Sequence, residues 1–380
     1  MTLHSSVNGT LFWRPSERRL KLQRRYNFAQ RFRLLEEMGA GGFGQVWRVT
    51  DTLLDQEVAL KIGQGDMSQE TLALRRLRKD RYISVYDYVY DGGFDASAYS
   101  MELLKHPWYT LEDYHHTFIA PNLADDSKIL HGIRLIMFII VDVLTSLAQP
   151  HGKKHSKGNR WVHGDIKPQN IYVNHGAAKL AMKQTPDNFV AFTKIGDLGL
   201  VHRAGEMCSG FTFGYCSPEQ ASPTNEGISC SSDLYSVGQT LSFLLVGRVL
   251  DDEELRNAAR IKSVILDTVR SGYLAASLAR FVKELTSKAP SLRGSAEDAK
   301  RGLVNAFLPD RDLAILSVFL VEASRQLTLN EAADRGFDSI KALKGWNNRS
   351  GERIGIVKQL IKGLKTKGVL ASASGLYRMT

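Results

Sequence analysis

Cysteine is scarce in this sequence of 380 residues. It occurs three times, at Cys208, Cys216 and Cys230, and no two of these form a CxxC pair. Such spacing offers neither the usual zinc-binding pattern nor a disulfide framework. The simplest interpretation is a protein of a reducing compartment, so we expect a cytoplasmic location.

A long uninterrupted apolar run is also missing. The most apolar stretch, residues 133–148, is short for a bilayer span and contains Arg134 and Asp142. The first residues lack the charged start and apolar run of a secretory signal. We therefore expect a buried helix at 133–148 rather than a membrane span.

The net charge of +10 is unevenly distributed. Residues 14–33 and 344–380 each carry eight Lys or Arg and one Glu, so the segment between them is slightly acidic. The plainer interpretation is that these flanks are solvated tails. The alternative is contact with an acidic partner or a membrane surface. Nucleic acid would suit the charge as well, but we do not expect it.

Residues 31–51 predict a strand, a glycine cluster and a second strand. Gly39, Gly41 and Gly44 stand at GxGxxG spacing and Val46 follows. Glycines let a backbone approach phosphate oxygens without an intervening Cβ. Dinucleotide-binding folds share this spacing, but there the strand leads into a helix. Here β-type sequence continues, which favours a strand–loop–strand lid over the phosphates of ATP.

A lysine and a glutamate follow the glycine cluster. Lys61 lies in VALK, which reads as a buried strand with one charged side chain. In residues 68–79, helical spacing places Glu70, Leu74 and Leu77 on one face. A carboxylate on an inward face needs a partner, and Lys61 is the expected one. A surface lysine and an exposed glutamate are the alternatives.

Residues 99–104, YSMELL, are apolar except for Glu102. This suits a connection between two lobes. Backbone groups of Glu102 and Leu104 could hydrogen-bond adenine, and Met101 would shape the back of the pocket.

The run WVHGDIKPQNIYV, residues 161–173, is the segment of the sequence that says most about function. Phosphoryl transfer to a hydroxyl needs an acceptor for its proton, a positive charge near the phosphate and a metal ligand. Asp165, Lys167 and Asn170 supply these within six residues. Asp197, between an apolar strand and a glycine turn, could bridge Mg²⁺ to the phosphates and complete the metal site. An ordinary turn aspartate is the alternative.

These motifs resemble, in their order, those of the eukaryotic-type protein kinase superfamily, Ser/Thr branch, with HGD in place of HRD. The similarity covers roughly residues 31–343. It implies an α+β, bilobal fold with a small β-rich N-lobe carrying one regulatory helix and a larger, mainly helical C-lobe. It also implies transfer of the γ-phosphate of ATP to protein Ser or Thr hydroxyls, with Mg²⁺ held by Asn170 and Asp197.

The resemblance assigns further roles. Asp165 would be the catalytic base, Lys167 would stabilise the γ-phosphate, and Lys61 would pair with Glu70 in the active state. The nucleotide-binding positions would be Gly39, Ala40, Gly41, Gly42, Phe43, Gly44, Val46, Ala59, Lys61, Met101, Glu102 and Leu104.

Other positions match the family's pattern after the catalytic loop. Lys167, two residues after the proposed base, resembles the pattern of the Ser/Thr branch. Thr212 would line the site of the substrate hydroxyl, as in Ser/Thr enzymes. Glu219 would pair with a distant arginine, for which Arg335 is the expected residue. Asp233 would brace the catalytic loop.

The chain also departs from the pattern. Gly164 replaces the arginine that usually meets a phosphate on the activation segment. We therefore expect activity that does not depend on phosphorylation of that segment, where Ser209 is the first candidate site. Glu70 lies only nine positions after Lys61, which implies a shortened helix or loop.

The resemblance divides the chain into four predicted regions. Residues 1–30 would be a basic extension, 31–104 the N-lobe and hinge, 105–343 the C-lobe with an insertion around 250–310, and 344–380 a basic tail. In the tail, helical spacing of apolar residues predicts a helix docked on the kinase body, or else a basic amphipathic helix on a membrane or partner.

Two other functions share part of this pattern. One is a small-molecule phosphotransferase of related fold. Such enzymes usually have His two residues after the aspartate and lack the SPE segment, which is Ser217, Pro218 and Glu219 here. The other is a pseudokinase scaffold, against which the full set of catalytic side chains argues.

Overall fold

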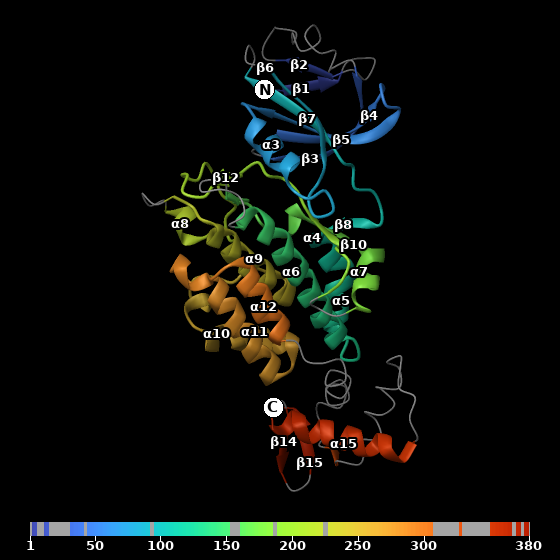
Figure 1. The fold of residues 1–380 in the computed structure, drawn as a ribbon, viewed down its shortest axis with the longest axis vertical. Helices are drawn as coiled ribbons and strands as arrows, with labels where there is room; N and C mark the ends of the chain where they lie inside the picture. Colours follow the sequence, from blue (N-terminus) through green and yellow to red (C-terminus); the bar gives the residue numbers. More distant parts are fainter. Residues whose placement is uncertain are drawn as a thin grey trace.

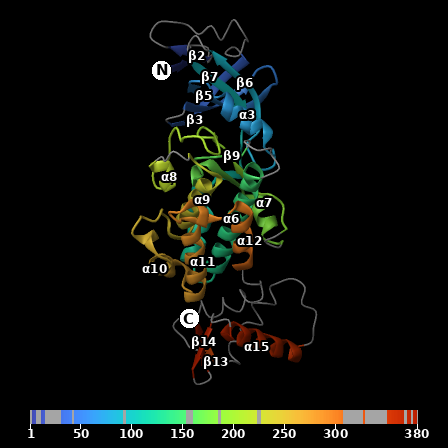
Figure 2. The same ribbon diagram turned by 60° about the vertical axis from the view of Figure 1, so that its left-hand side comes forward.

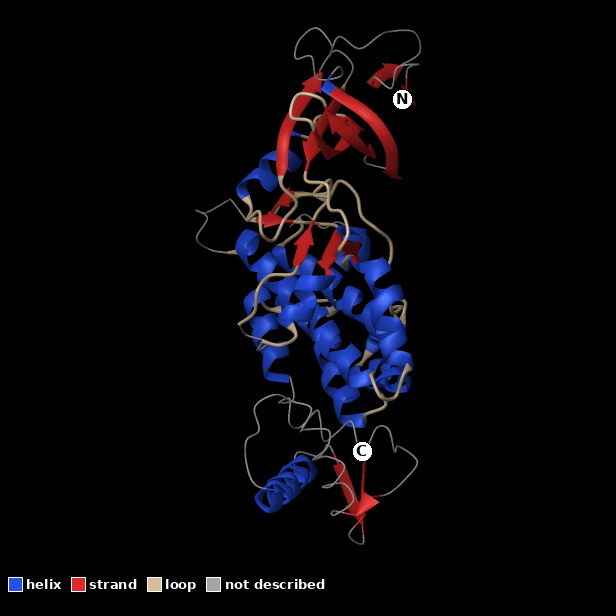
Figure 3. Ribbon diagram, turned by 90° about the vertical axis from the view of Figure 1, so that its right-hand side faces the viewer, coloured by secondary structure: helices blue, strands red, loops and turns tan. Residues whose placement is uncertain are grey.

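A computed structural model describes residues 2–5, 11–14, 31–41, 44–91, 95–152, 160–184, 188–222, 227–306, 327–328, 350–366, 370–373 and 376–379. Strands gather at one end of the molecule and helices form its middle (Figure 1 and Figure 3). This is the predicted α+β fold, with a small β-rich N-lobe and a mainly helical C-lobe.

The N-lobe is an antiparallel sheet with the strand order β3-β4-β5-β7-β6. Its strands are Phe32–Gly41 (β3), Gly44–Asp51 (β4), Gln56–Gln64 (β5), Val85–Asp91 (β6) and Ala96–Met101 (β7). Successive side chains of a strand point to opposite faces. Val58, Leu60 and Ile62 of β5 therefore join one apolar cluster, while Lys61 faces the other side. Among the described residues of this lobe, the helix is α3, Ser68–Arg76.

Helix α6, Ile129–His151, forms the centre of the C-lobe. It is long and apolar enough to cross a membrane, but 83% of its most apolar window is buried inside the protein. Its one buried acid, Asp142, is paired with Arg81 at 2.5 Å and accepts hydrogen bonds from the Phe192 and Thr193 N–H groups. The predicted buried helix is confirmed.

Helices α9 and α12 both pack against α6 (Figure 2). The first is Cys230–Val246, and it ends at Gly247 in a left-handed conformation. The other helices are Leu111–Tyr114 (α4), Ala120–Ala124 (α5), His175–Ala181 (α7), Pro218–Ala221 (α8), Ala258–Val269 (α10), Gly272–Leu285 (α11) and Ala296–Ala306 (α12). Short helical turns are His115–Ile119 (η1), Pro168–Asn170 (η2), Glu254–Arg256 (η3) and Pro290–Arg293 (η4).

The segment in which the sequence predicts an insertion is built into this lobe. Helices α10, α11 and α12 contribute buried apolar residues to the main core, among them Ile265, Leu278 and Leu303. Turn η4 packs against α9. Residues 258–306 therefore help to support the centre of the C-lobe.

Two small sheets flank the catalytic loop. Trp108–Thr110 (β8), Ile171–Asn174 (β10) and Thr193–Ile195 (β11) pair in the order β11-β10-β8. Trp161–Val162 (β9) pairs with His202–Arg203 (β12). The catalytic loop runs between β9 and β10, so both of its ends are anchored in sheets.

Elements near the two termini lie outside these lobes. Thr2–Ser5 (β1) pairs with Leu11–Arg14 (β2). At the other end, Leu327–Thr328 (β13), Leu370–Ala373 (β14) and Leu376–Met379 (β15) form a sheet beside helix α15, Ser350–Thr366. Ile361 and Leu364 of the predicted apolar helix face are buried, and α15 contacts β14. This face is thus at least partly covered by the terminal sheet.

Candidate active site

The ion pair that the sequence predicts between Lys61 and Glu70 is present. Lys61 Nζ lies 2.9 Å from Glu70 Oε1, and both side chains are buried. The Tyr99 hydroxyl donates to the same carboxylate at 2.7 Å. Burial opposes a charge on Lys61, but Glu70 and Asp197 outweigh it and raise the pKa of the lysine. The lysine is therefore held as a buried cation between Glu70 and Asp197.

The short spacing between this lysine and glutamate has a structural explanation. Strand β5 ends at Gln64 and α3 begins at Ser68, so few residues connect them. Ser97 on β7 fastens the connection, because its hydroxyl donates to Gly65 O and accepts from the Met67 N–H. The helix is short, but its first turn still places Glu70 beside the lysine.

The glycine cluster joins β3 to β4. Gly41 pairs with Gly44 at the tip, and Gly42 and Phe43 lie outside the described residues. Gly44 has φ +129°, and a Cβ there would lie 2.2 Å from Ile62 O. Only glycine fits this position. The predicted strand–loop–strand arrangement is present in the described part.

The remaining predicted nucleotide contacts lie on adjoining strands. Val46 on β4 is the cross-strand partner of Lys61, and Ala59 on β5 is the partner of Met101. Gly39 and Ala40 occupy the end of β3. The sheet therefore brings the lid, the lysine and the hinge side by side.

At the hinge, the backbone of Glu102 is only half available to a ligand. Its N–H donates to Ser84 O at 2.8 Å, which leaves its carbonyl as the group that could contact adenine. Its carboxylate binds Lys194 at 2.6 Å, so the side chain is held in place. Leu104, two residues on, is half-buried.

Three side chains meet at the catalytic loop. Lys167 Nζ lies 2.7 Å from Asp165 Oδ2 and donates to Thr212 Oγ1 at 2.8 Å. The Thr212 hydroxyl donates to Asp165 Oδ1 at 2.5 Å. Thr212 comes from a segment more than 40 residues further along the chain, and each of the three side chains contacts the other two. A carboxylate, an ammonium group and a hydroxyl are thus held in mutual contact at one point.

Each of the two expected metal ligands contacts another residue of the site. Asn170 Nδ2 donates to Asp165 Oδ2 at 3.0 Å and to Asp165 O at 2.8 Å, which turns its amide oxygen the other way. Asp197 has φ +54°, and its Oδ1 lies 2.5 Å from Lys61 Nζ. Burial disfavours its charge, but Lys61 prevails and lowers the pKa of the Asp197 carboxyl. A carboxylate and an amide oxygen are donors that suit Mg²⁺, so the residues fit this ion.

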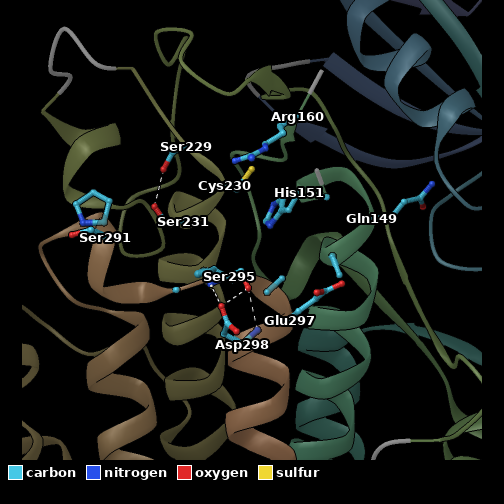
Figure 4. Close-up of a pocket in the computed structure, with 16 residues that line it drawn as sticks. Gln149, His151, Arg160, Ser229, Cys230, Ser231, Ser291, Ser295, Glu297 and Asp298 are labelled. Atoms are coloured by element: carbon cyan, nitrogen blue, oxygen red, sulfur yellow. Dashed lines mark hydrogen bonds between the residues drawn. The ribbon is translucent and has the colours of Figure 1, made fainter. Parts of the chain in front are cut away.

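Asp233 on α9 braces the catalytic loop, as the sequence predicts. The carboxylate is fully buried and accepts from the His163 and Gly164 N–H groups, each at 2.9 Å. His151, at the end of α6, also contacts it through Nε2 at 2.8 Å. Figure 4 shows His151 beside Cys230 and Arg160 on the wall of a cavity of about 1030 Å³.

The partner of Glu219 differs from the predicted one. Arg293 of η4 binds the Glu219 carboxylate with both guanidinium nitrogens, at 2.5 and 2.9 Å, and is fully buried. Arg335, the expected partner, lies outside the described residues. Arg293 also donates to Ser231 O at 3.0 Å, so it ties α8 to the start of α9. The prediction failed because the arginine was sought too far along the chain.

Gly164 is in a left-handed conformation, with φ +78°. A Cβ added there would lie 2.4 Å from Leu200 O, on the segment that follows Asp197. The residue that departs from the family's pattern therefore sits where two catalytic segments touch through their backbones.

Sequence reasoning missed several residues of this site. Tyr99 was read only as part of the hinge, although its place two residues before Met101 puts it on the same strand face. His151 and Arg293 carry no local signal, since their partners are remote in the sequence.

The fold and this arrangement of side chains define a protein kinase domain. The family model described as "Protein kinase domain" matches residues 32–302, and the chain belongs to this family.

Curated relatives agree with this membership. The chain is 28% identical over 294 residues to the serine/threonine-protein kinase PrkC of Bacillus subtilis, covering 74% of this chain and 41% of the relative. It is 27% identical over 253 residues to the probable serine/threonine-protein kinase PknB of Lactococcus lactis, covering 62% and 34%. For the serine/threonine-protein kinase ArnS of Sulfolobus acidocaldarius, the identity is 28% over 241 residues, covering 58% and 38%. The chain thus spans less than half the length of these relatives.

Proposed function

We propose that the chain is an ATP-dependent protein kinase that phosphorylates Ser or Thr. The observation that carries this proposal is the contact between Asp165, Lys167 and Thr212. It combines a proton acceptor, a cation for the transferring phosphate and a hydroxyl that lines the acceptor position. The relatives reported above are named serine/threonine-protein kinases or probable ones, which favours the same substrate class.

In the proposed reaction, the acceptor hydroxyl lies beside Asp165, in the place from which Thr212 now donates. Its oxygen attacks the γ-phosphorus of ATP, the bond to the β-phosphate oxygen breaks, and ADP leaves. Asp165 takes the hydroxyl proton, and the Lys167 ammonium group offsets charge on the phosphoryl oxygens. Asn170 and Asp197 would hold Mg²⁺, which neutralises phosphate charge when bound.

Lys61 has a positioning role in this proposal. It would hold the α- and β-phosphates, and Glu70 keeps its ammonium group in the cleft. The contact between Lys61 and Glu70 supports this role, because it is the arrangement of the N-lobe that we expect transfer to require.

The two rival functions are less well supported. A small-molecule phosphotransferase has no need of Thr212 and the SPE segment, yet Glu219 of that segment is anchored by a buried arginine. A pseudokinase scaffold would not need Lys61, Asp165 and Asp197 to retain their contacts.

Partners beyond ATP follow from the same proposal. The substrates would be proteins with Ser or Thr acceptors. We also propose that the basic flanks, residues 14–33 and 344–380, contact an acidic partner or a membrane surface.

The test is transfer of labelled phosphate from ATP, with Mg²⁺ and a mixed protein substrate, followed by phosphoamino acid analysis. Asp165→Asn keeps the shape of the side chain but removes the base, and it should lower transfer by about 10²–10⁴-fold. Asp267→Asn, on the exposed face of α10, is the matched control and should transfer like the wild type. Equal labelling by wild type and Asp165→Asn, or label only on small molecules or tyrosine, would contradict the proposal.

A further inference from the structure

Gln220 of α8 is a buried side chain with hydrogen bonds to three separate segments. Its Nε2 donates to Gly164 O in the catalytic loop at 2.9 Å and lies 3.9 Å from Cys208 Sγ in the activation segment. Its Oε1 accepts from the Ser217 N–H at 3.0 Å. Only 1% of the residue is exposed. One carboxamide therefore joins the activation segment, the turn into α8 and the catalytic loop.

The bond to Gly164 O acts on the peptide that carries the proposed base. The Gly164–Asp165 peptide has its carbonyl bound by Gln220 and its N–H donating to His163 Nδ1 at 3.2 Å. The preceding N–H, of Gly164, is bound by Asp233. Because the Asp165 Cα belongs to this peptide plane, the orientation of the plane sets the direction of the carboxylate.

We propose that Gln220 is a positioning residue, which links the docked activation segment to the orientation of Asp165. The proposal rests on the kinase function proposed above. In the family's pattern, an arginine before the catalytic aspartate meets a phosphate on the activation segment. Here the corresponding contact would be uncharged. Gly164 has no side chain to meet a phosphate, and the carboxamide of Gln220 binds its backbone instead.

The chemistry of this link requires a carboxamide. Gly164 O needs a donor and the Ser217 N–H needs an acceptor, and Gln220 supplies one of each in opposite directions. Glutamate has the same shape, but its ionised form would place a second acceptor against the Gly164 carbonyl. Its protonated form has an O–H that can donate there. Gln220→Glu therefore makes the link dependent on pH.

The experiment measures kcat and KM for Gln220→Glu across pH and divides each by the wild-type value. The kcat ratio should fall about 10- to 100-fold as the introduced carboxyl ionises, because a buried carbonyl then loses its donor. The KM for ATP should stay near the wild-type value, since the hinge and Lys61 are unaffected. A purely structural role would lower the amount of folded protein without this dependence on pH.

Gln239 on α9 provides a matched control. It is also buried, and it donates to Leu250 O at 2.8 Å and accepts from the Leu250 N–H at 3.1 Å. Gln239→Glu makes the same chemical change away from the catalytic loop. Its kcat ratio should not vary with pH, even if its unfolding midpoint falls. Similar pH profiles for the two variants, or a flat profile for Gln220→Glu, would overturn the proposal.

Hydrogen exchange separates this proposal from the proposed function. At a pH high enough to ionise the introduced carboxyl, Gln220→Glu should speed exchange of the amides of residues 163–167, whereas Gln239→Glu should not. Unchanged exchange in Gln220→Glu would refute the link whether or not the protein transfers phosphate. A wild type that transfers no phosphate would refute the proposed function, and the exchange result would still decide whether Gln220 holds the loop.

Discussion

Replacing Gly164 with alanine tests whether the catalytic loop depends on close backbone contact with the segment after Asp197. The substitution adds only one methyl group. Its Cβ would lie 2.4 Å from Leu200 O, where ordinary contact begins near 3.4 Å, so one of the two backbones has to move by about 1 Å. Both backbones lead to proposed catalytic residues.

The expected loss of stability in Gly164→Ala has two causes, the strain of a left-handed backbone and the close contact with Leu200 O. Gly247→Ala separates them. Gly247 has φ +77°, close to the +78° of Gly164, but a Cβ there meets nothing within 4 Å. Gly247→Ala should therefore cost only the left-handed strain, about 1–2 kcal/mol of the free energy of unfolding. Gly164→Ala should lower the free energy of unfolding by this amount and by a further amount, because its Cβ also clashes with Leu200 O. A shift of about 1 Å at the base should also lower kcat by about 10²-fold.

Urea unfolding of both variants and steady-state transfer assays at equal folded concentration give the comparison. Gly247→Ala should keep a kcat near that of the wild type, since it lies at the far end of α9. If Gly164→Ala loses no more stability than Gly247→Ala and keeps its kcat, the reasoning from backbone contact is refuted.

Three further predictions follow from the contacts around this site. Arg293→Met should lower the free energy of unfolding by about 3–5 kcal/mol, because it leaves the Glu219 carboxylate unpaired in a largely buried place, and urea unfolding measures this. Burial and, secondly, His116 lower the pKa of His115 to about 4, so this ring is neutral in the fold but charges in the unfolded chain below about pH 6.5. The stability that it contributes should be lost as pH falls from about 6.5 to 4, by about 1–2 kcal/mol after solvent screening. Ser209→Ala should retain wild-type transfer, measured with protein shown by mass spectrometry to carry no phosphate on the activation segment.

Each of these has a matched comparison. A double substitution of Arg293 and Glu219 by apolar residues should recover part of the loss, and no recovery would contradict the ion pair. His115→Phe should flatten the stability profile between pH 6.5 and 4, whereas an unchanged profile would show that other groups cause it. Loss of transfer in Ser209→Ala would mean that phosphorylation of the segment is required.

Contacts that depend on a local pattern could be predicted from the sequence. Helical spacing placed Glu70 on the inward face of a short helix, and burial then left Lys61 as its natural partner. The HGDIKPQN run brought Asp165, Lys167 and Asn170 together because a loop between two short strands keeps its residues close. These residues lie only a few positions apart, so their proximity could be predicted without the tertiary structure.

Contacts between remote segments could not be predicted in the same way. Arg293 lies in a segment that reads as an insertion, and nothing near it in the sequence marks it as the partner of Glu219. Gln220 follows a family motif, but the direction of its carboxamide depends on where the catalytic loop and Cys208 meet α8. Both contacts exist only once the helices of the C-lobe have packed.

The sequence alone determined the class of fold, the order of the site residues and the chemical groups available to the cleft. These follow from periodicity, glycine spacing and side-chain chemistry, which act over a few residues. Tertiary structure decided that Arg293 is the partner of Glu219, where Gln220 binds, and why position 164 is glycine. Such contacts join segments tens of residues apart, so their distances are set by the packing of the whole lobe.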